Sequence, residues 1–149
     1  MKDQLRLAGC IIPDSKGRIL LIHRNTTKRR QWEIPGGKID ELVDGKIVRS
    51  GRSAEETVRH ELKEEVGVDV EISRKLGDRE FSEDQYVMHY SWYLGEIVVG
   101  KPIIGEPDKY DDLQYFSQTQ LSSMRDELSG NTRNFLDAWV AGEVTLLLV

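Results

Sequence analysis

Residues 53–67 read SAEETVRHELKEEVG, and this stretch determines how the rest of the chain is interpreted. Ser53 stands three residues before Glu56, which is the spacing of a capping box at the start of a helix. Apolar residues recur at every fourth position up to Val66, and Gly67 is placed to end the helix. The pattern therefore predicts an amphipathic helix with one buried stripe.

Three glutamates share one side of this expected helix. At about 100° per residue, Glu61, Glu64 and Glu65 fall together along the border of the apolar stripe. Glutamates that only keep a helix soluble would lie opposite the stripe, and like charges within one turn repel each other. Two interpretations stay open from the residues alone, a solvated charged face or a site for Mg²⁺ or Mn²⁺, which prefer clustered oxygen ligands.

A second motif, WEIPGGK at residues 32–38, precedes the acidic helix. A double glycine allows the backbone to approach a ligand or another element closely, although most such stretches are only turns. Its position between a short strand and the acidic helix favours a role at the same site. A bare carbonyl oxygen there would complete a set of oxygen ligands.

Elements on either side of the helix are mainly β-strands. Residues 5–12 and 18–23 flank a turn cluster and are expected to form a hairpin, and residues 38–51 a loop or small hairpin. Further expected elements are strands at 31–34, 68–76, 86–97 and 113–116, a connection at 81–85, a loop at 101–112, and helices at 121–128 and 132–140. This order predicts an α/β fold with a mixed sheet and helices on its faces.

Composition fits one domain over residues 1–149. Hydrophobic residues make up 38% of the chain and charged residues 32%, with a net charge of −5. That charge argues against a nucleic-acid coat, which needs a basic face, and no apolar run has the length of a membrane span. A single cysteine, Cys10, among apolar neighbours is expected in the core, and with no apolar N-terminal leader the chain is expected to be cytoplasmic.

The two motifs together resemble the signature of the Nudix hydrolases, the MutT-like family. The family's Arg-Glu-apolar-X-Glu-Glu-X-Gly-apolar pattern is matched by HELKEEVGV at residues 60–68, and PGGK at residues 35–38 matches the opening of the box. There are three departures. His60 replaces the family's Arg, Arg52 replaces its first Glu, and Gly37 and His60 are 23 positions apart, nine more than usual, with the insertion between Lys38 and Gly51.

This resemblance implies an α/β/α sandwich and a metal site. The ligands of Mg²⁺ or Mn²⁺ would be Glu61, Glu64 and Glu65 with the carbonyl of Gly36. The reaction would be hydrolysis of a nucleoside diphosphate linked to another moiety, X, with a metal-activated water as nucleophile. The carboxylate that accepts the proton of that water stays open between Glu64, Glu65 and Glu106 in a later loop.

Substrate contacts are expected from cationic and aromatic side chains. Arg24 after the second strand and Lys38 after the double glycine are candidate phosphate ligands, and Trp32 could stack on a base. A small-molecule nucleotide is therefore the expected partner, with a (d)NTP of the MutT type favoured. ADP-ribose, a nucleotide sugar or a dinucleoside polyphosphate is the alternative, as is a catalytically silent nucleotide-binding module, and the chain would act as a monomer or homodimer without nucleic acid or membrane.

Overall fold

The computed structural model describes residues 3–147, two fewer at each end than the expected domain. Two sheets and a separate hairpin form its framework. The elements in chain order are β1 (Asp3–Ile11), β2 (Ile19–Asn25), β3 (Arg30–Glu33), β4 (Gly36–Lys38), β5 (Glu41–Val43), β6 (Lys46–Val48), α1 (Ala54–Val66), β7 (Asp69–Glu83), β8 (Tyr86–Val99), β9 (Tyr110–Phe116), α2 (Gln118–Ser123), a 3₁₀ turn (Arg125–Glu127) and α3 (Gly130–Val140).

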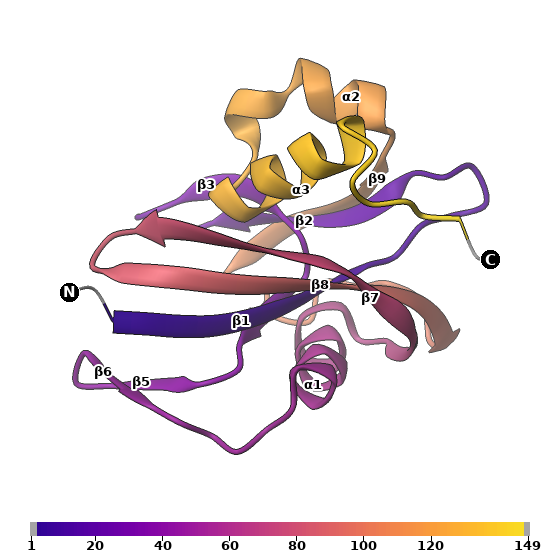
Figure 1. Ribbon diagram of the computed structural model, residues 1–149. Helices are drawn as coiled ribbons and strands as arrows, with labels where there is room; N and C mark the ends of the chain where they lie inside the picture. Colours follow the sequence, from indigo (N-terminus) through magenta and orange to yellow (C-terminus); the bar gives the residue numbers. More distant parts are fainter. Residues whose placement is uncertain (1–2, 148–149) are drawn as a thin grey trace.

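The larger sheet has the order β4-β1-β8-β7 and the smaller one β3-β2-β9. Strands β1 and β8 run parallel, whereas their other partners are antiparallel, so the sheet is mixed as expected. Helix α1 packs against one side and α2 with α3 against the other (Figure 1). The expected α/β/α arrangement is therefore confirmed.

The expected hairpin between the first two strands is wrong. Strand β1 has β4 on one edge and β8 on the other, so neither edge is free for β2. The chain turns at Asp14, whose carboxylate accepts hydrogen bonds from the backbone N–H groups of Lys16 and Arg18. Beyond the single bridge from Pro13 to Ile19, β2 leaves for the smaller sheet.

The expected connection at residues 81–85 is also mostly strand. Strand β7 stays paired with β8 as far as Glu83, opposite Tyr86, and the turn consists of Asp84 and Gln85 alone. Residues 38–51 form the small hairpin β5–β6. Helix α2 starts earlier than expected and stops at Ser123, where a 3₁₀ turn replaces its second half.

Two apolar cores lie on the two faces of the larger sheet. One lies under α1 and contains Val58, Leu62 and Val66, the predicted stripe of the helix. Cys10 belongs to it, fully buried, and burial raises the pKa of its thiol to about 12. The other core lies under α3 around Trp92 and Phe135. No helix in residues 3–147 is long and apolar enough to cross a membrane.

Candidate active site

Helix α1 has the predicted ends. The Ser53 hydroxyl accepts a hydrogen bond from the backbone N–H of Glu56 at 3.1 Å. Gly67 adopts the left-handed conformation, with φ 71°, and donates its N–H to the carbonyl of Lys63. Because these caps fix both ends and the apolar stripe faces the sheet, the three glutamates are held along the border between core and solvent.

The double glycine lets strand β4 pass between β1 and α1. A Cβ atom on Gly36 would lie 2.3 Å from the carbonyl oxygen of Ala8, and one on Gly37 would lie 2.7 Å from Cδ of Glu61. Either contact is far shorter than real Cβ atoms allow. Close packing against backbone therefore requires glycine at Gly36, whereas a side chain at Gly37 would displace the carboxyl group of Glu61. The two glycines bring the backbone of β4 against the acidic side of the helix.

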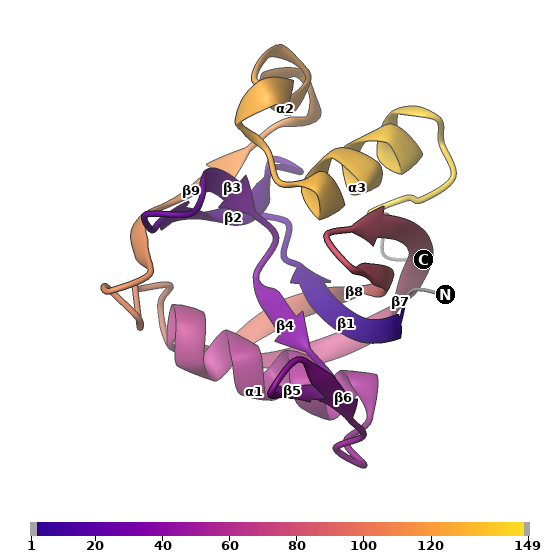
Figure 2. The same ribbon diagram turned by 90° about the vertical axis from the view of Figure 1, so that its left-hand side faces the viewer.

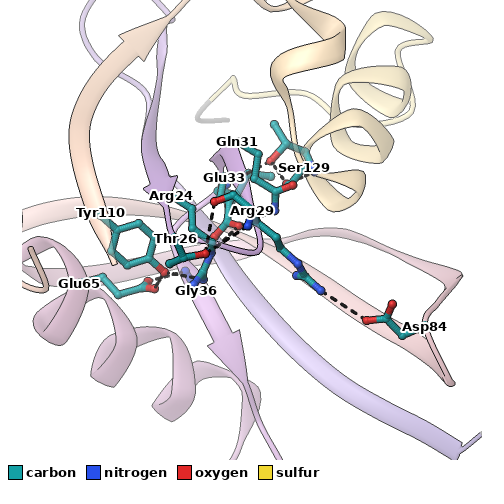
Figure 3. Close-up of polar contacts among 12 residues, drawn as sticks. Arg24, Thr26, Arg29, Gln31, Glu33, Gly36, Glu65, Asp84, Tyr110 and Ser129 are labelled. Carbon is teal, nitrogen blue, oxygen red and sulfur yellow. Dashed lines mark hydrogen bonds and ion pairs between the residues drawn. The ribbon is translucent and has the colours of Figure 1, made fainter. Parts of the chain in front are cut away.

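Glu65 is the most buried of the three glutamates, with 4% of its surface exposed. Its carboxylate accepts one hydrogen bond from the backbone N–H of Gly36 at 2.9 Å and another from the hydroxyl of Tyr110 at 2.7 Å (Figure 3). Burial raises the pKa of Glu65 to about 8, although these hydrogen bonds favour the charged form. The side chain thus joins α1, β4 and β9.

Glu61 and Glu64 lie differently on the same helix. Glu61 packs on Gly37, and burial raises the pKa of its carboxyl, with Glu106 adding to the rise and His60 opposing it. The side chain of Glu64 is more than half exposed, with one oxygen 4.0 Å from Nε2 of His60. Along the helix, the carboxylate is therefore half-buried at Glu61, solvent-facing at Glu64 and buried at Glu65.

Glu106 is brought to this helix by its loop. The backbone N–H of Gly105 donates to the carbonyl of Glu65 at 2.9 Å, and that of Ile103 donates to Val66, so the loop satisfies the last carbonyls of α1. Glu106 accepts a hydrogen bond from Nζ of Lys109 at 3.3 Å. Its negative charge also contributes to the raised pKa of Glu61.

Arg24 is already engaged with protein groups. Its Nε donates to Glu33 at 2.9 Å, its Nη2 donates to the hydroxyl of Tyr110 at 2.9 Å, and its guanidinium lies over the Tyr110 ring (Figure 3). Tyr110 thus bridges Arg24 and Glu65. Sequence reasoning missed Tyr110, because it lies 45 positions from Glu65 in a segment interpreted as a loop.

A cavity of about 280 Å³ opens beside the double glycine. Arg24 and Lys38, the candidate phosphate ligands, line it together with Gly36. Trp32, the expected stacking residue, is not among its lining residues. It packs edge-on against Phe116 in the core under α3, with the ring centroids 4.8 Å apart.

Two of the three departures from the signature, Arg52 and His60, are exposed residues. A different contact holds the start of the inserted segment. The fully buried carboxylate of Asp40 pairs with Arg6 at 2.6 Å and with Arg49 at 2.5 Å. The insertion is therefore tied to β1 by an ion-pair triad that the signature does not contain.

The predicted ligands are oxygen atoms of the type that a divalent cation prefers, but their side chains are not gathered around one point. Within residues 3–147, no group of three or more His, Cys, Asp or Glu side chains is gathered around one point. Neither Glu61 nor Glu65 has an ion pair with a described residue, yet both are at least partly buried. Buried carboxylates without a cationic partner are the expected environment for Mg²⁺ or Mn²⁺.

A family model for the NUDIX domain matches residues 4–139. The chain belongs to the NUDIX domain family. The comparison with curated proteins found no match. Among solved structures, a MutT Nudix hydrolase from Burkholderia pseudomallei is similar at 27% identity and a TM-score of 0.74, with 91% of this chain and 98% of that one covered.

Two more distant structures share the fold. A MutT protein from Methanosarcina mazei Go1 is 22% identical, with a TM-score of 0.77 and coverage of 95% of this chain and 96% of that one. An ADP-ribose pyrophosphatase from Streptococcus suis is 18% identical, with a TM-score of 0.63 and coverage of 93% and 89%. The family and these hydrolases support an enzyme of the pyrophosphohydrolase class.

Proposed function

We propose that this enzyme hydrolyses the pyrophosphate linkage of a nucleoside diphosphate linked to X, with a (d)NTP of the MutT type as the favoured substrate. The observation that carries the proposal is the packing of the acidic helix on the double glycine. Glu65 bonds to Gly36 and Glu61 packs on Gly37, and these two glycines line the cavity together with Arg24 and Lys38, although the glutamates themselves do not line it. This packing supports a site in which the glutamates bind a metal and the cations bind the phosphates.

Glu61, Glu64 and Glu65, with the carbonyl of Gly36, would hold Mg²⁺ or Mn²⁺. When bound, such a cation spreads the charge of the phosphates and acidifies a water. The carboxylate of Glu65 already accepts two hydrogen bonds and is buried, whereas the side chain of Glu64 is 56% exposed and that of Glu106 is 26% exposed. One of the latter two is therefore the better proton acceptor for the attacking water.

Lys38 and Arg24 would contact the phosphates. Lys38 follows the double glycine directly and is exposed, so its ammonium group is free to reach an oxygen anion at the cavity mouth. The guanidinium of Arg24 is held by Glu33 and Tyr110, so it is rigid before substrate arrives. A preorganised cation loses less side-chain entropy when it binds a phosphate.

The MutT assignment is supported by the 27% identical hydrolase, which is matched along nearly its whole length. ADP-ribose, a nucleotide sugar or a dinucleoside polyphosphate is the alternative substrate class. A UDP-X diphosphatase shares the fold at 19% identity, but this chain covers only 65% of it. The single buried cysteine supports a reducing, cytoplasmic setting.

A panel of substrates tests the proposal. The purified chain is incubated with dNTPs, ADP-ribose, a UDP-sugar and a dinucleoside tetraphosphate, each with Mg²⁺ or Mn²⁺. The nucleotide products are separated by chromatography and the nucleoside monophosphate that forms is measured. We expect turnover of at least one dNTP. We expect Glu61→Gln and Glu65→Gln to lower it by about 100-fold or more, because each removes a ligand or its charge.

Glu56→Gln is the matched control, since Glu56 lies on the same helix and is exposed away from the site. It should keep turnover within about twofold. If Glu61→Gln and Glu65→Gln also keep full turnover, the site is wrongly placed. If nucleotides raise the melting temperature but no substrate is hydrolysed, the silent binding module suggested by Arg52 and His60 is correct instead.

A further inference from the structure

The inserted segment of the signature forms the hairpin β5–β6, which lies beside β1 near its N-terminal end (Figures 1 and 2). We infer that this hairpin is one wall of the substrate cavity and that Leu42 is a specificity-determining residue, in contact with the nucleobase. The inference rests on the proposed function for its substrate class. It concerns residues that the family signature does not contain.

The hairpin is held as a rigid unit. Its turn is Asp44-Gly45, with positive φ angles at both residues, which is the tight two-residue turn that matches the twist of paired strands. The carboxylate of Asp40 ties its base to Arg6 of β1. The hydroxyl of Tyr86 donates to the carbonyl of Gly45 and ties its tip to β8.

The two faces of the hairpin differ. Leu42 and Ile47 are directly opposite each other, half-buried, and pack against the apolar cluster of Leu5, Tyr86 and Met88. Val43 and Val48 are about half exposed, at 48% and 45%. The hairpin therefore turns one apolar pair toward the sheet, and of that pair only Leu42 also lines the cavity.

Along β1 the cavity has a cationic end at Lys38 and then an apolar stretch, beyond which Glu83 and Asp84 of the β7–β8 turn also line it. Gly36 pairs with Gly9 and Lys38 with Leu7, so the carboxylates and cations lie toward the middle of the strand. Leu5, beside Met88, lies further toward the start of the strand, and Leu42 lines the cavity with them.

A nucleotide carries its charged and apolar groups in the same order as this cavity, with the phosphates at one end and the base at the other. Its phosphates suit the end with Lys38 and the double glycine, while the flat apolar faces of a base suit walls made of leucine, methionine and phenylalanine side chains. A substrate placed by its phosphates therefore directs its base toward Leu42. The hairpin limits how large that base can be and how deeply it enters.

Methyl NMR tests this contact without relying on turnover. The ¹³C-labelled methyl groups of Leu42, Ile47 and Val43 are followed while GMP, CMP or ribose 5-phosphate is added to the wild-type chain. We expect the Leu42 methyls to shift with a nucleoside monophosphate and to stay in place with ribose 5-phosphate, which lacks a base. Ile47 and Val43, outside the cavity lining, should stay in place throughout.

Kinetics on a matched pair of variants gives the second readout. Leu42→Ala and Ile47→Ala remove similar apolar contacts from the same cluster, but only the first removes a cavity wall. We expect Leu42→Ala to raise KM for the best dNTP about tenfold with kcat within about twofold, because binding is lost equally from ground and transition states. Ile47→Ala should leave KM within about twofold.

Each outcome bears on one proposal or the other. Equal KM values for the two variants, or Leu42 methyls that do not respond to GMP or CMP, would overturn the role of Leu42. A wild-type chain that hydrolyses nothing contradicts the proposed function instead. In that case Leu42 methyls that shift with GMP still support the hairpin as a binding wall.

Discussion

At the scale of single residues, Asp40 shows how this chain keeps its signature loop in place. Its carboxylate has no exposed surface, and two guanidinium groups neutralise it. The hydroxyl of Ser50 closes the other end of the insertion by donating to the carbonyl of Ile39. Arg52 and His60, the residues that replace the signature's Glu and Arg, are exposed, whereas the ion pairs of Asp40 join the inserted segment to β1.

This ion-pair triad predicts a pH-dependent stability. Hydrogen bonds from Arg6, with further help from Arg49, lower the pKa of Asp40 to about 2 from an ordinary 3.8. A lowered folded-state pKa stabilises the fold above the unfolded pKa and loses that effect as pH falls toward 2. Because both guanidinium groups are partly exposed, we expect Asp40→Asn to cost about 1–2 kcal/mol of unfolding free energy at pH 7.

Urea unfolding at pH 7 and at pH 2.5 measures this effect. The difference between wild type and Asp40→Asn should shrink markedly at the lower pH, where Asp40 is increasingly protonated. Glu41→Gln is the control, because the neighbouring Glu41 is exposed and has no ion pair with a described residue. A difference that stays constant between the two pH values would show that the charge of Asp40 is not what matters.

At the scale of elements, the loop between β8 and β9 and the C-terminal end of α1 act as one unit. Gly105 lies so close to the helix that a Cβ atom there would be 2.1 Å from the carbonyl oxygen of Glu64. The loop must be this close for its N–H groups to bond to the last turn of α1. In this position the loop holds Glu106 beside the helix.

Gly105→Ala should therefore displace the loop and impair catalysis. A misplacement of about 1 Å in a catalytic group can cost 100-fold in rate, so we expect kcat to fall by about 10- to 100-fold. Gly77→Ala is the control, since a Cβ there meets its nearest atom at an ordinary 3.5 Å. Circular dichroism shows whether both variants fold. If Gly105→Ala folds and keeps the wild-type kcat, Glu106 and its loop do not take part in catalysis.

Helix α1 shows what local sequence can predict. Its two caps and its apolar spacing are all contained within fifteen residues, and the structure confirms them. Strand pairing is different. The sequence around Ile11 does not indicate that β4 and β8 occupy both edges of β1. The predicted hairpin between the first two strands is wrong for that reason.

The same limit applies to the site. Glu61, Glu64 and Glu65 were recognisable from their spacing on one helix, and the double glycine from its place in the signature. Tyr110 and Asp40 were not, because each acquires its role from a partner more than thirty positions away. Trp32 was expected at the substrate because of its neighbours in sequence, but its side chain faces the opposite core.

At the scale of the whole molecule, the site lies where three parts of the fold meet. Helix α1 supplies the glutamates, β4 of the larger sheet supplies the glycines, and β9 of the smaller sheet supplies Tyr110 (Figures 2 and 3). The two hydrogen bonds to the buried carboxylate of Glu65 join both sheets to the helix. A cation bound by that carboxylate would offset the cost of its burial and so stabilise the whole fold.

Thermal unfolding with and without metal tests this coupling. A ligand at about 100 times its Kd stabilises a protein by about 2.7 kcal/mol, which in a domain of this size corresponds to a rise in Tm of about 5–10 °C. We expect such a rise with Mg²⁺ or Mn²⁺, little rise with NaCl at matched ionic strength, and loss of the rise in Glu65→Gln but not in Glu56→Gln.

General screening of charge repulsion also raises Tm, because the chain has a net charge of −5. At matched ionic strength this screening acts equally in the divalent salt and in NaCl, and equally on the wild type, Glu65→Gln and Glu56→Gln. A rise that NaCl reproduces, or that Glu65→Gln retains, would therefore mean that Glu65 does not bind the metal.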